Sequence, residues 1–477
     1  MAQPSLTVAR PVETVGARLE PNAIGLAQDT VIGMASSAPA ASVGLTLAVL
    51  AGAAAYGSGP VILVTAVPML IIANSYRRLN LWNASCGASF EWVGRAISPY
   101  LGFLTGWLMI AAYVIATVSG VEVLGPSVLA IFGSNSSSTF GNILIGTIVG
   151  VVMLVIAIVG IKITARTQVA MAIVEYAILV GLAIVGLVAV LLHHHGTVPF
   201  SRGWLNLSGI GGRGSAVAGF LVAVFIFTGW DGTLYVNEEV KHRRVNPGLA
   251  AVLAVGLLAV IYTISIVGLQ GAVSPGKLQA NSDDALVYVA QALGGGGWAK
   301  VMALSLALSV IATTGTGIVL TARIIYGMAS YRTLPASLAT VSRRFATPVN
   351  ASIVVGLLII GLAWVYLLTT SVQNAFNDVV DVTGLLFAIF YIFTATSTIV
   401  YYRRRIASNA WDALLAGILP IGASIFLGWV VVKSLLAAPA TQIWSLVGVI
   451  AVGVILMLVA RFAWQSPFFQ IQREQAP

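Results

Sequence analysis

Long apolar blocks alternate with short polar segments along almost the whole chain. Each block approaches or exceeds the ~20 residues that a helix needs to cross the hydrocarbon core of a bilayer. The blocks are continuous, whereas strands of a membrane barrel alternate apolar and polar positions. Because lipid cannot satisfy free backbone groups, each block must be helical. The pattern therefore predicts twelve transmembrane helices, over residues 25–54, 60–76, 99–124, 141–161, 167–192, 217–236, 247–268, 301–326, 351–368, 379–402, 413–432 and 443–462.

Composition agrees with a membrane protein. Of the 477 residues, 58% are hydrophobic and only 8% are charged, with a mean hydropathy of +0.97. Soluble domains carry about 25% charged residues, so this chain has too little charge to cover a water-exposed surface. Cys86 is the only cysteine, which excludes an internal disulfide and a cysteine-based metal site. No cofactor is predicted.

The basic residues predict the orientation of the spans. With twelve spans both termini lie on one side, and placing that side in the cytoplasm puts 19 of the 24 Lys and Arg residues inside. This distribution satisfies the positive-inside rule. The net charge of +9 is therefore explained by topology in the plasma membrane, and no nucleic-acid partner is predicted. Residues 1–23 and 464–477 are predicted to be cytoplasmic tails.

Two of the predicted spans are interrupted. The first contains Ser36-Ser37-Ala38-Pro39, where the proline removes a backbone donor. The sixth contains Thr228 to Gly232, with two glycines around Trp230 and Asp231. Paired interruptions five spans apart indicate an inverted-repeat transporter with its site at the breaks. For the first span, a continuous kinked helix is the alternative.

This architecture divides the chain into a transport core and an addition. Spans one to five and six to ten form the two repeats, over residues 24–402. Spans eleven and twelve, over residues 403–463, are additional helices. Each break frees N–H groups on one half-helix and C=O groups on the other. Donors suit a carboxylate and acceptors suit an ammonium group, so an amino acid matches both, whereas an amine or polyamine would need an added acid.

Two motifs carry a family resemblance. The segment "GWDGTLYVNEEVKHRRVNPG" and the segment "TARIIYGMASYRTLP" resemble the sixth helix end and the eighth helix of amino acid–polyamine–organocation (APC) permeases. The resemblance covers nearly the whole chain. It implies a secondary active transporter, not an enzyme, that moves an amino acid by alternating access. An amine or polyamine permease and an amino-acid exchanger are alternatives of the same fold, and an ion channel is an alternative of another class.

The resemblance also suggests site residues. In this family an aromatic residue just before the sixth-helix break covers the substrate, and Phe225 takes that gating position. The family's glycine-rich "GSG" break is replaced here by Ser36-Ser37-Ala38-Pro39, and Glu175 stands where some relatives carry a lysine in place of a sodium ion. The coupling ion, a proton or another cation, therefore stays open. The predicted substrate-binding residues are Ser36, Ser37, Ala38, Phe225, Phe227, Thr228, Gly229, Trp230, Thr313 and Thr316.

Several of these residues have a plain structural alternative. Phe227 and Trp230 are equally suited to packing, and the hydroxyls of Thr313 and Thr316 to bonds between helices.

Acidic residues inside spans are candidates for coupling. Asp231 either titrates with a transported proton or hydrogen-bonds a neighbouring helix. Glu175 either takes part in coupling or pairs with a basic residue. Asp29, near a span end, is expected to be solvated.

Glu238 and Glu239 follow the sixth span. They form either a solvated end beside Lys241 and Arg243, or an inner gate that closes against Arg77, Arg78 or Arg166. The run His193-His194-His195 is expected to form a surface turn, and no metal site is predicted.

Overall fold

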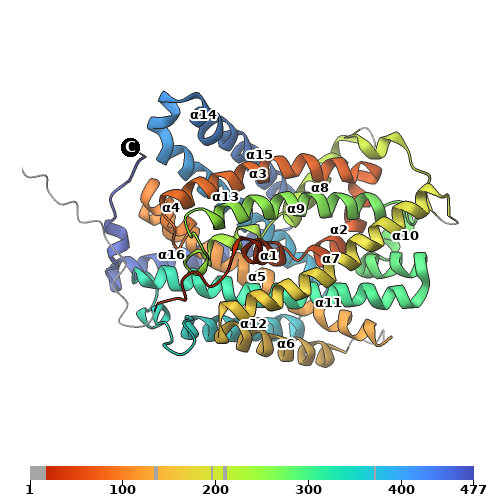
Figure 1. The fold of residues 1–477 in the computed structure, drawn as a ribbon, viewed down its shortest axis with the longest axis horizontal. Helices are drawn as coiled ribbons and strands as arrows, with labels where there is room; N and C mark the ends of the chain where they lie inside the picture. The colour runs from red at the N-terminus through yellow and green to blue at the C-terminus, as the bar shows by residue number, and fades with distance from the viewer. Residues whose placement is uncertain (1–17, 134–137, 195–196, 208–211, 370–371, 477) are drawn as a thin grey trace, which may run out of the picture.

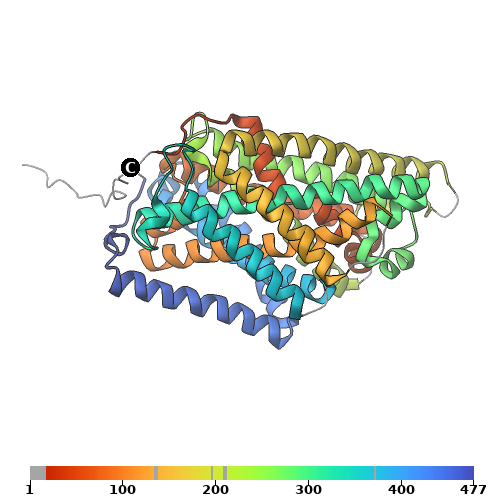
Figure 2. The same ribbon diagram turned by 90° about the horizontal axis from the view of Figure 1, so that it is seen from below.

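The computed structural model describes residues 18–133, 138–194, 197–207, 212–369 and 372–476. This part of the chain is helical, apart from loops and one isolated bridge between Ile24 and Val240. The helices run side by side along the long axis of the molecule (Figures 1 and 2). Their bounds are α1 Leu26–Ser36, α2 Pro39–Ala54, α3 Ser58–Trp82, α4 Ser89–Ala96, α5 Pro99–Ile131, α6 Thr139–Val159, α7 Ile161–Leu191, α8 Gly212–Ile226, α9 Asn246–Leu269, α10 Pro275–Ala280, α11 Ala285–Ser330, α12 Val349–Thr369, α13 Val372–Ser408, α14 Ala410–Asp412, α15 Leu419–Ala437 and α16 Ala440–Leu458.

The predicted all-α membrane fold is confirmed. Among the described residues, eleven helices or joined helix pairs are long and apolar enough to cross a bilayer. Each matches one predicted span, and the sixth predicted span corresponds to the shorter apolar stretch Ala218–Leu234. The count of twelve therefore stays a prediction, because the broken sixth segment lacks the length of a regular span.

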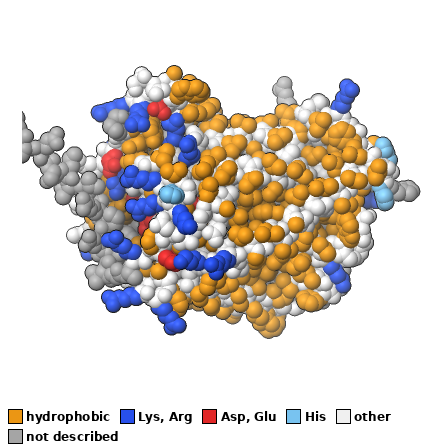
Figure 3. Space-filling model, viewed as in Figure 1, with side chains coloured by type: hydrophobic (Ala, Val, Ile, Leu, Met, Phe, Trp, Pro, Cys, Tyr) orange, Lys and Arg blue, Asp and Glu red, His pale blue; other side chains and the backbone are white. Residues whose placement is uncertain are grey.

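The surface agrees with a bilayer environment. Hydrophobic side chains cover the middle of the molecule in Figure 3, while Lys and Arg gather at the end that holds α4 and α14 in Figure 1. We call this the basic end. Large apolar side chains such as Ile173, Leu357 and Val365 are more than 60% exposed. Such exposure is favourable in hydrocarbon, where no hydrophobic penalty applies.

Both predicted interruptions are present. α1 ends at Ser36 and α2 begins at Pro39, with Ala38 between them at a φ of 46°. Proline suits the first position of the new helix because its missing N–H would have no partner there. In the sixth segment, α8 ends at Ile226, and a 3₁₀ turn starts at Trp230 after Gly229 at a φ of 96°. The alternative of a continuous kinked first helix is therefore wrong.

Close helix packing depends on glycine at several crossings. At the crossing of α7 and α9, a Cβ added to Gly186 would lie 2.5 Å from the carbonyl oxygen of Gly268. The backbone of Gly268 cannot move aside for an added Cβ in the way that the end of a flexible side chain could. By contrast, a Cβ added to Gly181, on the same helix, would meet nothing within 4 Å.

We expect Gly186→Ala to destabilise the protein by about 1–3 kcal/mol, the usual cost of overpacking a tight contact. Gly181→Ala should leave stability unchanged or slightly raised, since alanine favours helix. Thermal unfolding in detergent, followed by circular dichroism, checks both variants. Equal unfolding temperatures would contradict the tight crossing.

Candidate functional site

The two broken helices touch at their breaks. The Ser36 hydroxyl donates to the carbonyl oxygen of Gly229. The Tyr113 hydroxyl lies 3.0 Å from the same oxygen, and the Gly229 N–H donates to the Tyr391 hydroxyl at 3.3 Å. A Cβ at position 229 would lie 2.5 Å from the Ser36 carbonyl oxygen. Glycine is therefore required here both for its positive φ and for the close approach.

Asp231 is fully buried beside this contact and is held by tyrosines. The hydroxyls of Tyr113 and Tyr391 lie 3.1 and 2.6 Å from its Oδ1, and Tyr235 donates to Oδ2. An ionised carboxylate only accepts hydrogen bonds, so hydroxyl donors suit it. Of the two predicted roles, this geometry provides directly for the hydrogen-bonding one.

A cavity of about 70 Å³ lies between the breaks, α5, α11 and α13. Most of its lining side chains are small or hydroxyl-bearing, Leu45, Phe225 and Val310 are larger and apolar, and none is charged. Six predicted substrate residues line it: Ser36, Ser37, Ala38, Phe225, Thr228 and Thr313. Eight further lining residues were not predicted: Ala41, Ser42, Leu45, Ala116, Ser119, Gly120, Val310 and Thr383.

The other four predicted residues do not line this cavity. Phe227 packs edge-on against Tyr262, and Trp230 stacks on Tyr391. The Thr316 hydroxyl donates within α11, to the carbonyl oxygen of Ala312 at 3.1 Å. The Gly229 carbonyl oxygen accepts from the Ser36 hydroxyl, and the Gly229 N–H donates to Tyr391. Packing and backbone bonding therefore describe these four positions better than substrate contact.

The cavity presents hydrogen-bond acceptors. The Thr313 hydroxyl donates to the Ala35 carbonyl oxygen at 2.8 Å, and the Thr228 hydroxyl donates to that of Phe225 at 2.8 Å. The Ser42 hydroxyl likewise donates to a carbonyl oxygen, that of Ser37, at 2.7 Å. Since each hydroxyl proton is used on the backbone, the oxygen lone pairs remain to accept bonds from a ligand.

The backbone donors at the start of α2 are occupied by side chains. The Ala40 N–H donates to Glu175 Oε1 at 2.9 Å, and the Ala41 N–H donates to the Ser309 hydroxyl at 3.3 Å. The expectation that this break offers free N–H groups to a substrate is therefore wrong for this conformation. Glu175, fully buried on α7, caps α2 from outside the cavity.

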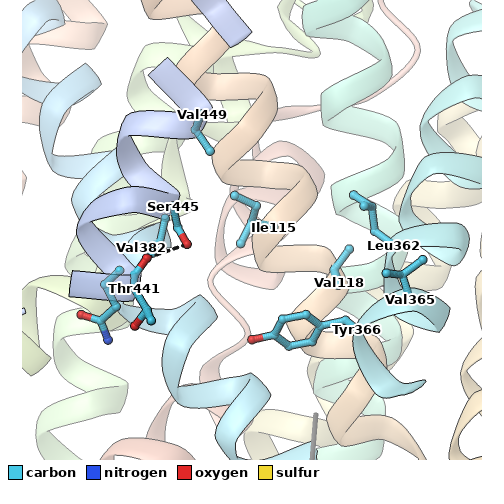
Figure 4. Close-up of a pocket in the computed structure, with 10 residues that line it drawn as sticks. Ile115, Val118, Leu362, Val365, Tyr366, Val382, Thr441, Ser445 and Val449 are labelled. Atoms are coloured by element: carbon cyan, nitrogen blue, oxygen red, sulfur yellow. Dashed lines mark hydrogen bonds between the residues drawn. The ribbon is translucent and has the colours of Figure 1, made fainter. Parts of the chain in front are cut away.

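Two larger cavities lie nearby. One of about 300 Å³, between α5, α12, α13 and α16, has walls that are mostly apolar, apart from groups such as Ser445 and Thr441 (Figure 4). None of the predicted substrate residues lines it. The other, of about 340 Å³, shares Leu45 and Phe225 with the small cavity and extends along α2, α8, α13 and α15. Phe225 therefore stands at the boundary between the small cavity and this one.

Of the two acids after the sixth span, Glu239 is fully buried and Glu238 is partly buried. Glu239 and Arg323 of α11 are both fully buried and form a two-pronged ion pair, with nitrogen-to-oxygen distances of 3.0 and 3.1 Å. The Glu238 carboxylate accepts from the Cys86 N–H at 3.2 Å. Burial raises the pKa of Glu238, which lies outside the predicted spans.

Neither predicted arrangement of these acids is found. Arg78, one proposed gate partner, pairs instead with Asp412 at 2.7 Å. Nor is Glu239 solvated, because the chain before α1 covers it: the Ala23 N–H donates to its carbonyl oxygen at 2.8 Å. The inner pair is therefore formed with α11, not with the loop arginines Arg77, Arg78 or Arg166.

Asp29 also departs from its predicted setting. This residue was expected to be solvated, but it is fully buried, and neither carboxylate oxygen has a hydrogen-bond partner. α1 packs against α7, α9, α11 and the turn after the sixth-segment break, so a residue on this helix is buried even near its start. The chain before it pairs with the segment after the sixth span, where the Lys241 N–H donates to Ile24 O at 2.9 Å.

The described histidines of the run after α7 lie away from these acidic residues. His193 and His194 are exposed at the end of α7, and His195 lies outside the described residues. In the part of the chain that the structure describes, no group of three His, Cys, Asp or Glu side chains is placed to hold a metal ion.

Breaking the inner ion pair should be costly. We expect Arg323→Met or Glu239→Gln alone to destabilise the protein by about 3–5 kcal/mol, since each leaves a buried group uncompensated. The double variant Glu239→Gln with Arg323→Met should recover much of this loss. Lys162→Met, which removes the exposed pair with Glu20, is the control and should change stability by less than ~1 kcal/mol. Thermal unfolding in detergent measures all four, and an additive double variant would contradict the pairing.

Comparison with known proteins agrees with this architecture. Residues 26–463 match the family model for amino acid permeases. The Asc-type amino acid transporter 1 of Mus musculus is 30% identical over 141 residues, which cover 30% of this chain and 26% of that protein. The D-serine/D-alanine/glycine transporter of Escherichia coli K12 is 21% identical over 348 residues, 71% of each chain.

A solved structure shares the fold. The manganese transporter of Eremococcus coleocola superposes with a TM-score of 0.62 at 14% identity, over 91% of this chain and 94% of that one. At this identity the likeness concerns the fold alone. The family model, in contrast, spans nearly the whole chain, so this multi-pass membrane protein belongs to the amino acid permease family.

Proposed function

We propose that the chain is a secondary active transporter that carries a small neutral amino acid across the plasma membrane by alternating access. The observation that carries this proposal is the cavity between the two breaks, with its hydroxyl-bearing lining and its lack of charged side chains. Family membership supports transport. The basic end (Figure 3) supports a cytoplasmic location for that side and for both termini.

The size of the cavity supports a small substrate. Its volume of about 70 Å³ is far below the ~300–1,000 Å³ of pockets for drug-sized ligands. Walls of alanine, glycine and serine on α2 and α5 leave room for a short side chain only. Glycine, alanine and serine form the proposed substrate class, in line with the substrates for which the Escherichia coli relative is named.

The lining favours an amino acid over an amine or polyamine. Acceptor oxygens of Ser36, Thr228 and Thr313 suit an ammonium group. An amine without its own carboxylate would need a protein acid, yet Asp231 is turned toward three tyrosine hydroxyls and does not line the cavity. A zwitterion brings its own negative charge. An exchanger would use the same cavity, and counterflow measurements distinguish it from net uptake.

Two other candidates fit less well. A manganese ion, the substrate for which the Eremococcus coleocola transporter is named, would need ligands such as carboxylates at the cavity, and the lining has none. An ion channel would need a continuous polar pore, whereas fully buried Trp230 and the buried Glu239–Arg323 pair follow the break.

Glu175 is the proposed coupling residue. Its carboxylate occupies the Ala40 N–H at the positive end of the α2 dipole, and a substrate carboxylate would seek the same end. Two carboxylates there repel each other, so substrate binding and ionisation of Glu175 oppose each other. Protonation of Glu175 would release Ala40 and favour the substrate, which couples uptake to a proton. Asp231, satisfied by tyrosines, is assigned to holding the break, with proton transfer as the alternative.

The first functional test is uptake of labelled glycine, alanine and serine by proteoliposomes, with Gly120→Ala as the probe. A Cβ at Gly120 meets only Val310, at 3.6 Å, so the variant should fold and lose cavity volume. A methyl group in a pocket changes discrimination about 10–200-fold. We therefore expect Gly120→Ala to lower kcat/KM for serine about 10–200-fold relative to kcat/KM for glycine.

Gly256→Ala, which meets nothing within 4 Å, is the control and should transport all three amino acids as the natural chain does. Saturable flux of these substrates supports the proposal. Absence of uptake by the folded natural chain for every neutral amino acid tested would overturn it.

The coupling proposal predicts the behaviour of Glu175→Gln. In the natural chain an inward proton gradient should accelerate uptake, because a proton enters with the substrate. Glu175→Gln should keep exchange of substrate across the membrane but lose acceleration by the gradient. Uptake with and without an imposed pH gradient measures this. Undiminished acceleration in Glu175→Gln would move the coupling role to another group, with Asp231→Asn as the next variant.

A further inference from the structure

The carboxyl-terminal segment is docked across the basic end of the molecule. Its sequence predicts a solvated tail, but it runs along this end toward α14 (Figures 1 and 2). Phe468 is fully buried, and Ala476, near the end of the chain, is only 2% exposed. Burial at Phe468 and again at Ala476 indicates that the segment is held by specific contacts at both positions.

Aromatic packing forms its first anchor. The Phe468 ring stacks on Phe90 of α4, with ring centroids 4.1 Å apart, and meets Tyr331 edge-on at 5.5 Å. The ring also lies against Gly94 of α4, at a position where an added Cβ would meet it at 2.5 Å. The absence of a side chain at Gly94 therefore makes the seat for Phe468.

Polar contacts form a second anchor. The Glu474 carboxylate pairs with Arg95 of α4 at 2.7 Å and accepts from the Trp82 indole N–H at 3.3 Å. The Glu474 N–H donates to the Arg95 carbonyl oxygen, and the Ala476 N–H donates to that of Tyr401 in α13, both at 2.9 Å. The segment thus joins the end of α3, α4 and α13, and through Phe468 it also reaches Tyr331 after α11.

The loop before α4 links this segment to the inner ion pair. In that loop the Cys86 N–H donates to Glu238, and the Ser85 carbonyl oxygen accepts from Asn237 at 3.0 Å. Asn237 and Glu238 directly precede Glu239. The loop leads directly into α4, and α4 is held by the carboxyl-terminal segment. Opening this side by parting the loop from Asn237 and Glu238 would therefore pull on α4.

We propose that residues 466–476 form a strap that holds the cytoplasmic side of the transporter closed, and that its release lets α4 and the preceding loop move. This inference rests on the alternating access of the proposed function. Phe468 anchors the strap in apolar surroundings, while Glu474, whose side chain is 37% exposed, is the anchor that solvent reaches.

Cys86 provides a built-in reporter. It is the only cysteine in the chain and is fully buried in the loop beside Glu238. The rate of its alkylation by N-ethylmaleimide in the purified full-length protein measures how often this side opens. We expect Phe468→Ala to raise that rate about tenfold. Glu474→Gln, which loses only a partly exposed ion pair, should raise it by less, about two- to fivefold.

Gln472→Ala, an exposed position within the strap, and Phe462→Ala, 70% exposed before it, are the controls and should label at the rate of the natural chain. A chain ended after residue 465 should label fastest, and if it does not fold, the two point variants decide. Folded strap variants that label at the natural rate would overturn the strap.

This readout is independent of transport. Faster labelling in a protein that carries no amino acid would support the strap and overturn the proposed function. Unchanged labelling with intact uptake would overturn the strap alone.

Discussion

The contact between Ser36 and the Gly229 peptide is the constraint on which the centre of this protein depends. An interrupted helix in a bilayer leaves backbone donors and acceptors without partners, at several kcal/mol each. Here the first break satisfies part of the second, through the Ser36 hydroxyl on the Gly229 carbonyl oxygen. Without a Cβ at position 229 the two backbones approach closely enough for this bond.

The remaining free groups determine which side chains surround the breaks. The Tyr391 hydroxyl accepts from the Gly229 N–H and donates to Asp231, so one hydroxyl satisfies a peptide and a carboxylate together. The single hydroxyl proton of Tyr113 lies within reach of both the Gly229 carbonyl oxygen and Asp231. On the other break, Glu175 takes the Ala40 N–H. The Asp231 carboxylate thus accepts hydrogen bonds from neutral tyrosine hydroxyls. The Glu175 carboxylate instead accepts from the start of α2, and other residues of α2 line the cavity. This difference is why the two acids receive different proposed roles.

Sequence patterns identified the features that depend on local chemistry. Pro39 and Gly229 mark the breaks because their backbone properties are visible without a fold, and the residues beside them line the cavity. The α5 residues that line the cavity were not predicted, since Ala116, Ser119 and Gly120 are ordinary small residues of an apolar helix. They stand at positions i, i+3 and i+4, which lie on one face of a helix. This shared face is the sequence feature that could have identified them.

Contacts between residues far apart in the chain could not be predicted from the sequence alone. Glu239 and Arg323 are 84 residues apart, and charge counting assigns Arg323 to the inner side without naming a partner. Asp29 lies near a span end, where acids are usually solvated, yet it is buried because α1 packs against α7, α9 and α11. The docked carboxyl-terminal segment was equally hidden, since its polar composition is typical of a free tail and only the fold brings it to Arg95.

The ion pairs Glu239–Arg323 and Arg95–Glu474 differ in the cost of separating them, and in the proposed strap this difference sets the order in which they separate. Separating Glu239 from Arg323 while both are fully buried would leave two uncompensated charges, at several kcal/mol each. Water must therefore arrive before that pair opens, or the pair must move as a unit. The Arg95–Glu474 pair is already partly solvated, and exposed pairs contribute only about 0–1 kcal/mol. If the strap acts as proposed, opening from the basic end would begin at the Arg95–Glu474 pair and loosen α4. It would reach the buried pair only once the loop before α4 admits water.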